Sequence, residues 1–268
     1  GWMSQLGSMR SRTSARLSFR SRRDQPGSSR SSQPTQAGLG TMLYLPRTPC
    51  VAHHWPNSRT KSSGISWGQV FQDLIDNPTI LPYLTAWLGP KVRLDHDYAI
   101  FMSKGEQRGR LHGGENGHEG DHWYKYRDGT IRTGLTVVTF FAAPAGPDDG
   151  GFTCIPGTHK TNFLKSIPDD VRQFERNAHY VHQPVAEAGD ALIFTEALVH
   201  GTTSWRARHQ RRTLLYKYSP GHSTWSQSYY SLDEFNGHLT EQQKRILAPP
   251  SIGQRPDSVE DWETLIDA

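Results

Sequence analysis

Cysteine and long apolar runs are both scarce in this chain of 268 residues, and their scarcity excludes several classes of protein. The two cysteines, Cys50 and Cys154, are too few for a disulfide framework or a thiolate metal cage. We therefore expect a reducing, cytoplasmic location. No run of about eighteen apolar residues occurs, so we expect no transmembrane helix and no membrane partner.

Acidic residues are scarce at the start of the chain. Residues 1–30 contain seven arginines and a single acid, Asp24, which gives this segment a charge of +6. The whole chain carries +4, so the remainder carries −2 and is not a nucleic-acid-binding surface by charge. Residues 1–40 are rich in Ser, Arg, Gly and Pro, which predicts a disordered basic tail before a single domain at 41–268.

Short β-prone segments separated by Gly, Pro and Asp turns dominate the chain from about residue 92 onward. The expected strands cover residues 94–102, 134–141, 153–155, 191–194 and 213–218. Short strands at this spacing are typical of an antiparallel sandwich or jelly roll. The sequence therefore predicts an all-β core.

Helices are expected on either side of this core. The first begins near Ser66, its candidate cap, and is broken by Pro78, after which a second short helix ends near Gly89. A polar inserted helix is expected over 169–177 and a C-terminal helix over 231–247.

Two histidines and one arginine carry the candidate chemistry. His112 lies in a Leu-His-Gly-Gly run, His200 lies far along the chain, and Arg211 follows on the next expected strand. Distant imidazoles followed by a guanidinium suggest a mononuclear iron site with an anchored carboxylate cosubstrate. With thirteen histidines in the chain, two of them can have a ligand-like spacing by chance. The order of the surrounding motifs is therefore needed to decide which histidines bind a metal.

Several motifs follow His112 in a characteristic order. They are an apolar strand at 134–141, Gly-Gly-x-x-x-Ile-Pro-Gly-Thr-His at 150–159, Gly-Asp-x-Leu-x-Phe at 189–194, His200-Gly201 and Arg211. On these motifs, residues from about 66 to 222 resemble the phytanoyl-CoA dioxygenase family of iron(II)/2-oxoglutarate enzymes. The resemblance implies a double-stranded β-helix (a cupin-like jelly roll), Fe(II), 2-oxoglutarate and O2.

The resemblance also implies roles for individual residues. His112 and His200 become the iron ligands, and Arg211 pairs with the far carboxylate of 2-oxoglutarate, for which guanidinium geometry is suited. Arg212 alternates to the opposite face of the strand. Thr202 lies where the family often has a hydroxyl that supports the cosubstrate.

Other histidines are not expected to bind the metal. His159, in the Pro-Gly-Thr-His turn, is expected to be a structural turn residue. His118 and His122 lie close to His112 in a polar loop, so they are expected to be decoys that resemble ligands only by their position in the sequence.

Gly114 stands two residues after His112, where the family pattern has Asp or Glu. In a first interpretation chloride fills the vacant coordination site beside Gly114, because a missing carboxylate leaves room and electrostatic demand for an anion. In a second interpretation Glu115, Glu119 or Asp121 supplies the carboxylate and the enzyme is a hydroxylase. A more distant third interpretation is a non-catalytic binding module. Glycine here could also mark a bulge or close backbone approach.

We favour the first interpretation, an iron(II)/2-oxoglutarate-dependent halogenase that chlorinates an unactivated carbon. The His-x-Gly pattern resembles the non-haem iron halogenases, and most of all the freestanding nucleotide halogenases of pentostatin-type nucleoside antibiotic pathways. That likeness implies a freestanding small-molecule substrate, a purine 2′-deoxynucleoside monophosphate, rather than a nucleic-acid polymer. Trp123, Tyr124 and Tyr126 are candidates for stacking on a base, although core and lid roles are more common for such residues.

Overall fold

A computed structural model describes most of the chain from residue 64 onward. The described residues are 42–45 (backbone only), 64–106, 109–114, 120–161, 166–227, 229–235 and 238–262. The expected disordered tail at 1–40 lies outside them, as does Cys50. Within these residues, the structure contains no helix with the length and apolar character needed to span a membrane.

Five antiparallel strands form the main sheet, in the order β1-β7-β5-β9-β2. Their bounds are β1 Met42–Leu45, β2 Arg93–Met102, β5 Thr136–Phe141, β7 Ala191–Thr195 and β9 Arg211–Ser219. Four of them, β2, β5, β7 and β9, overlap strands expected from the sequence. β1 was not expected.

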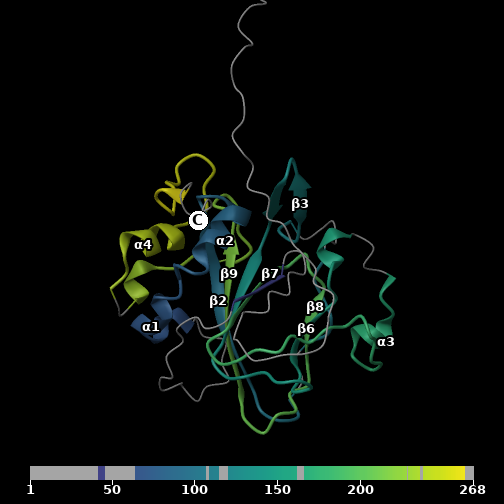
Figure 1. The fold of residues 1–268 in the computed structure, drawn as a ribbon. Helices are drawn as coiled ribbons and strands as arrows, with labels where there is room; N and C mark the ends of the chain where they lie inside the picture. Colours follow the sequence, from purple (N-terminus) through teal and green to yellow (C-terminus); the bar gives the residue numbers. More distant parts are fainter. Residues whose placement is uncertain are drawn as a thin grey trace, which may run out of the picture.

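A second, smaller sheet lies on the opposite side of the main sheet from the helices α1 (Gln69–Gln72) and α4 (Glu241–Leu247) (Figure 1). It consists of β6 (Gly151–Cys154) and β8 (His200–Thr203), which pair antiparallel. Single bridges extend this pair at both edges, from His200 to His112 and from Cys154 to His182. Two facing antiparallel sheets confirm the predicted all-β jelly roll with flanking helices.

A β-hairpin, β3 (Tyr124–Arg127) and β4 (Thr130–Thr133), projects from one end of the two sheets (Figure 1). Its turn residues Asp128 and Gly129 have φ angles of 52° and 80°. Two left-handed residues in succession are typical of the tight turns that join such strands, which explains the Asp-Gly pair.

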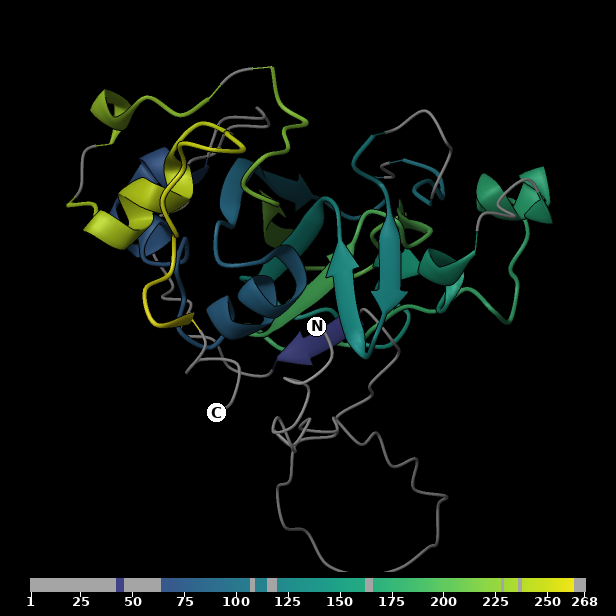
Figure 2. The same ribbon diagram turned by 90° about the horizontal axis from the view of Figure 1, so that it is seen from above.

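The main sheet separates two apolar cores. Residues on one face, including Val138, Phe140, Leu214, Tyr216 and Tyr218, pack against the helices α1 (Gln69–Gln72), α2 (Leu81–Leu88) and α4 (Glu241–Leu247). Residues on the other face form what we call the interior core: Met102, Val137, Phe141, Leu192, Phe194 and Leu215, with Phe152 and Trp205. Figure 2 shows α1, α2 and α4 together on one side of the sheets.

Two of the expected helices are shorter than predicted. The first is divided into a 3-10 turn (η1, Gly64–Trp67) and α1, because Gly68 between them has a φ of 138°. Ser66 therefore lies inside η1, and the residue at the N-cap of α1 is Gly68. α3 (Asp169–Arg172) does not reach residue 177, because Phe174 adopts a left-handed φ of 62°.

The C-terminal helix also differs from the expectation. α4 begins at Glu241 rather than near residue 231, because Thr240 and Gln243 form a reciprocal capping box there. A separate 3-10 turn, η4, covers Leu232–Glu234. α2 ends at Leu88, directly before Gly89, as predicted.

Candidate metal centre

His112, Glu196 and His200 come together at the edge of the smaller sheet. One potential ligand atom from each lies within 4.8 Å of the others. His112 and His200 exchange two backbone hydrogen bonds of 2.7 and 2.8 Å, which bring the ring centroids to 4.4 Å. Glu196 directly follows β7. Glu196 and His200 are buried while His112 is exposed, so one side of the cluster faces solvent.

Backbone carbonyls fix the orientation of both imidazoles. Nδ1 of His112 lies 2.8 Å from the Arg110 carbonyl oxygen, and Nδ1 of His200 lies 2.8 Å from that of Leu198. Because a carbonyl only accepts, Nδ1–H is the donor and the Nε2 lone pair remains for a metal. Burial lowers the pKa of His200 to about 4, so this ring is neutral at neutral pH.

Glu196 presents a charged carboxylate to these rings. Its Oε2 atom lies 3.5 Å from Nε2 of His200, while Oε1 accepts a 2.5 Å hydrogen bond from Nζ of Lys217. Burial alone raises the pKa of Glu196, but the charge of Lys217 and its hydrogen bond to the carboxylate outweigh burial and lower the pKa to about 2. Two neutral imidazoles and one carboxylate are the donor set of mononuclear iron sites, so these residues fit such an ion.

None of the acids proposed from the sequence is seen at the cluster. Glu115 and Glu119 lie outside the described residues. Asp121 is described, but its two carboxylate oxygens accept hydrogen bonds from the hydroxyls of Ser219 (3.1 Å) and Ser223 (2.5 Å). Sequence analysis missed the acid that does join the histidines. In the sequence, Glu196 is marked only by its position directly after the apolar strand 191–194.

The backbone requires glycine at both positions after His112. Gly113 and Gly114 have φ angles of 92° and 87°. A Cβ atom on Gly113 would lie 2.4 Å from the Leu198 carbonyl oxygen, and the N–H of Gly114 donates to the Glu196 carbonyl at 3.0 Å. A positive φ disfavours any side chain at Gly114, so backbone conformation is by itself a reason for glycine there. Glu196, whose carbonyl accepts this hydrogen bond, is the acid that lies in the cluster with the two histidines.

Arg211 points into the interior core from the first position of β9. It is buried, and its Nη1 atom contacts Sδ of Met102, a weak acceptor, at 3.2 Å. A Cβ atom on Gly151 would lie 3.1 Å from Nε of Arg211, so the glycine leaves room for the guanidinium. Arg212 is only half-buried, and its Nε atom donates to Gln210.

Two threonines of the main sheet carry buried hydroxyls that have no hydrogen-bond partner among the described residues. Thr213 is two residues after Arg211 on β9, and Thr139 lies between two interior-core residues of β5, so alternation directs both into the interior core. A guanidinium and two unpartnered hydroxyls in an apolar space fit a polar ligand such as a dicarboxylate. Sequence analysis missed both threonines. Thr202 is half-buried on β8, and its role stays a prediction.

His159 is buried, and its two ring nitrogens have no hydrogen-bond partner in the part of the chain that the structure describes. The hydrogen bonds of its turn come from Thr158 instead, whose hydroxyl donates to the Ile155 carbonyl and accepts from the N–H of Val199. Thr158 therefore carries the structural role that was expected of His159. The imidazole packs edge-on against Tyr124, with ring centroids 4.9 Å apart.

We expect His159→Phe to raise the free energy of unfolding by about 1–3 kcal/mol, because it removes two buried polar atoms that lack partners. The phenyl ring keeps the contact with Tyr124. Thr158→Val is the matched variant and should lower the free energy by a similar amount, because it removes both hydrogen bonds of the hydroxyl. Urea denaturation measures both. A destabilised His159→Phe protein would contradict the expectation.

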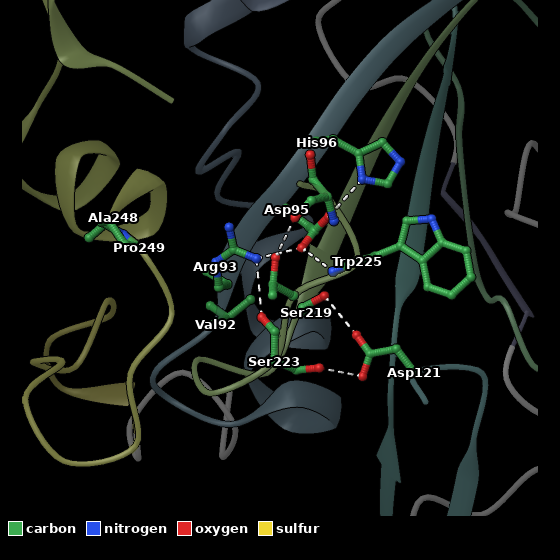
Figure 3. Close-up of polar contacts among 12 residues, drawn as sticks. Val92, Arg93, Asp95, His96, Asp121, Ser219, Ser223, Trp225, Ala248 and Pro249 are labelled. Atoms are coloured by element: carbon green, nitrogen blue, oxygen red, sulfur yellow. Dashed lines mark hydrogen bonds and ion pairs between the residues drawn. The ribbon is translucent and has the colours of Figure 1, made fainter. Parts of the chain in front are cut away.

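A polar network at Asp95 fixes the loop after β9 (Figure 3). Asp95 is the extra residue of a β-bulge in β2, and it accepts the N–H groups of Trp225 and Ser226, both at 2.9 Å. Arg93 and His96 also contact its carboxylate. Burial alone raises the pKa of Asp95, but these hydrogen bonds and the charge of Arg93 lower it to about 2. Bulges that redirect a side chain are common beside active sites.

The loop carries Trp225 to the metal cluster. The indole is 46% exposed and stacks on His122, with ring centroids 4.8 Å apart. Nε2 of His122 lies 3.9 Å from Oε2 of Glu196. His122 therefore borders the cluster without belonging to it. His118, the other expected decoy, lies outside the described residues.

The aromatic residues proposed to stack on a base have different surroundings. Lys125 lies over the Trp123 ring at 5.0 Å. Tyr124 contacts His159, and Tyr126 is 66% exposed on the hairpin. Their proposed role in base stacking stays a prediction.

Comparisons with known proteins agree with this fold. Residues 86–213 match the family model described as Phytanoyl-CoA dioxygenase (PhyH). None of the curated proteins compared matches the chain. HygX from Streptomyces hygroscopicus with nickel and 2-oxoglutarate bound gives a TM-score of 0.59 at 17% identity, covering 73% of this chain and 87% of HygX.

Two further HygX structures are also similar. The iron-bound structure gives a TM-score of 0.58 at 18% identity, covering 80% of this chain and 92% of HygX. The structure with nickel, 2-oxoglutarate and hygromycin B gives 0.52 at 19%, covering 75% and 76%. At these identities the likeness establishes the shared fold. Together with the match of residues 86–213 to the PhyH model, which covers slightly less than half of the chain, it supports an enzyme of the non-haem iron- and 2-oxoglutarate-dependent oxygenase type.

Proposed function

We propose that this protein is an iron(II)/2-oxoglutarate-dependent hydroxylase of a freestanding small molecule, with His112, Glu196 and His200 as the iron ligands. The observation that carries the proposal is the buried carboxylate of Glu196, whose Oε2 atom faces the two imidazoles. Bound iron and 2-oxoglutarate supply the activation of O2 needed to attack an unreactive C–H bond. Support for these cofactors also comes from the HygX structures, which contain 2-oxoglutarate with nickel, or iron.

The residues of this chain bind and orient the metal and 2-oxoglutarate. The carbonyls of Arg110 and Leu198 hold both imidazoles with Nε2 toward the metal position. Arg211 pairs with the far carboxylate of 2-oxoglutarate. The hydroxyls of Thr139 and Thr213 donate hydrogen bonds to 2-oxoglutarate from the interior core. The apolar side chains around them exclude water from this part of the site. The small-molecule substrate approaches from the solvent side, where His112 is exposed.

Halogenation is the second candidate. It is favoured by the missing carboxylate at Gly114, where chloride would occupy the position beside the metal. In this candidate Glu196 pairs with Lys217 alone and the metal has two protein ligands. The purine 2′-deoxynucleoside monophosphate substrate belongs to this candidate and stays a prediction.

Product analysis separates the candidates. The iron-loaded protein is supplied with 2-oxoglutarate, O2 and abundant chloride, and succinate is measured together with the masses of products from a substrate panel that includes purine 2′-deoxynucleoside monophosphates. The hydroxylase proposal predicts products that gain one oxygen. A chlorine isotope pair would favour halogenation instead. A protein that forms no succinate would contradict both.

Gly114→Asp tests the meaning of the glycine. We expect this variant to be destabilised by about 1–2 kcal/mol, because aspartate is forced into a backbone with a φ of 87°. Gly120→Asp is the control, since Gly120 has open space around it and no positive φ. The hydroxylase proposal predicts that Gly114→Asp never changes the kind of product. Loss of a chlorinated product in this variant would establish the chloride position.

A further inference from the structure

Lys217 lies on the inner face of β9, beside the metal cluster. It pairs with His96 of β2 and Val137 of β5, and it is two residues from Leu215 of the interior core. Alternation therefore directs its side chain between the two sheets. The side chain is 12% exposed, so its ammonium group is almost removed from water.

The two carboxylate oxygens of Glu196 have different contacts. Nζ lies 2.5 Å from Oε1, within hydrogen-bonding distance. The other oxygen, Oε2, is the one that faces Nε2 of His200 at 3.5 Å. One oxygen is therefore held by the lysine while the other is directed at the imidazoles.

Tyr98 restrains the ammonium group from its other side. Nζ lies 5.4 Å from the centroid of the Tyr98 ring, within the range of a cation–π interaction. The Tyr98 ring in turn stacks on His96, with centroids 6.1 Å apart. Because Lys217 contacts both Glu196 and Tyr98, its ammonium group is restrained in position. The carboxylate of Glu196 is restrained with it.

The same pairing sets the charge of the centre. The positive charge of Lys217 lies 2.5 Å from Oε1 of Glu196 and balances the negative charge of this carboxylate. A divalent ion bound here would keep its positive charge for an anionic ligand. An unpaired carboxylate would cancel part of that charge.

From this geometry we infer that Lys217 is a positioning residue of the metal centre, with two effects. It holds Oε1 of Glu196 so that only Oε2 is presented to the metal, and its charge strengthens the binding of an anionic cosubstrate. The inference rests on the proposed function, because it requires Glu196 to be a metal ligand.

Three variants of the full chain separate the two effects. Lys217→Met removes the hydrogen bond and the charge, Lys217→Gln keeps a hydrogen-bond donor without the charge, and Lys217→Arg keeps both. Co(II) is the probe, because its visible absorption depends on the number and kind of ligands. The dissociation constant for 2-oxoglutarate is measured on each Co(II)-loaded protein by calorimetry.

We expect Lys217→Met to change the Co(II) spectrum and to weaken 2-oxoglutarate binding by about tenfold or more, since a charge is lost a few ångströms from a dianion. Lys217→Gln should keep the wild-type spectrum with weakened 2-oxoglutarate binding, and Lys217→Arg should restore both. Lys125→Met, whose ammonium lies over Trp123 instead, is the control and should match wild type. If Lys217→Met does not fold, Lys217→Gln still tests the effect of charge.

Failure of this inference is distinguishable from failure of the proposed function. Wild-type binding of Co(II) that is lost in His200→Ala, together with Lys217 variants that match wild type in spectrum and affinity, would overturn the role of Lys217 alone. Wild-type protein that does not bind Co(II), or that binds it equally well after His200→Ala, would overturn the metal centre itself.

Discussion

Glu196→Gln is expected to weaken the binding of Fe(II) by more than about 100-fold, and to reduce 2-oxoglutarate-dependent succinate formation accordingly. Loss of residues that only support metal ligands already weakens binding by about 10- to 100-fold. An amide keeps the shape of the side chain but has no negative charge. Equilibrium dialysis under anaerobic conditions measures the dissociation constant directly.

Weaker iron binding in Glu196→Gln has two potential causes, a less stable protein and the loss of a metal ligand, and they have to be distinguished. Glu196→Gln leaves Lys217 as a buried charge without its counter-ion, and breaking a buried pair costs about 3–5 kcal/mol. The double variant Glu196→Gln, Lys217→Met removes both charges and should recover most of the stability without recovering metal affinity. Glu241→Gln changes an exposed acid on α4 and is the control for mutation itself. Unchanged iron affinity in the double variant would contradict the ligand role of Glu196.

Arg211→Ala is expected to raise the dissociation constant for 2-oxoglutarate by about 100-fold or more. A bidentate pair with a carboxylate has two charge-assisted hydrogen bonds, each contributing about 1.5–3 kcal/mol. The guanidinium is buried at the start of β9, where water replaces it poorly. Calorimetry on the metal-loaded protein measures the change, and iron affinity should stay close to wild type.

Arg212→Ala is the matched control for this prediction. Arg212 is the next residue of the same strand, but it is half-buried and bonded to Gln210 rather than directed into the interior core. It should bind 2-oxoglutarate as wild type does. An effect confined to Arg212→Ala would reassign the cosubstrate anchor from one arginine to its neighbour.

The strands of the main sheet were predictable because each face of this sheet packs against an apolar core, so that successive residues of a strand are apolar. β5 and β7 are buried at every position, and their residues are apolar apart from threonine. The β3–β4 hairpin was missed because its strands are polar and largely exposed, although Asp128-Gly129 was a usable turn signal. Helix lengths were overestimated where single residues, Gly68 and Phe174, leave helical geometry.

The candidate site was predictable only in part. The order of motifs pointed to His112 and His200, and the structure places the two side by side. The role of Glu196 depends on how the end of β7 packs against the bridge between these histidines, which no local pattern records. Lys217, Thr139 and Thr213 depend likewise on register between strands. Tertiary contacts of this kind lie beyond the reach of motif spacing.

A crystal structure of the protein with Fe(II) and 2-oxoglutarate, grown without oxygen and in the presence of chloride, tests the central claim most directly. We expect the metal to be bound by Nε2 of His112, Nε2 of His200 and Oε2 of Glu196, with Oε1 still on Lys217. A chloride ion bound to the metal beside Gly114, with both oxygens of Glu196 away from it, would contradict the account.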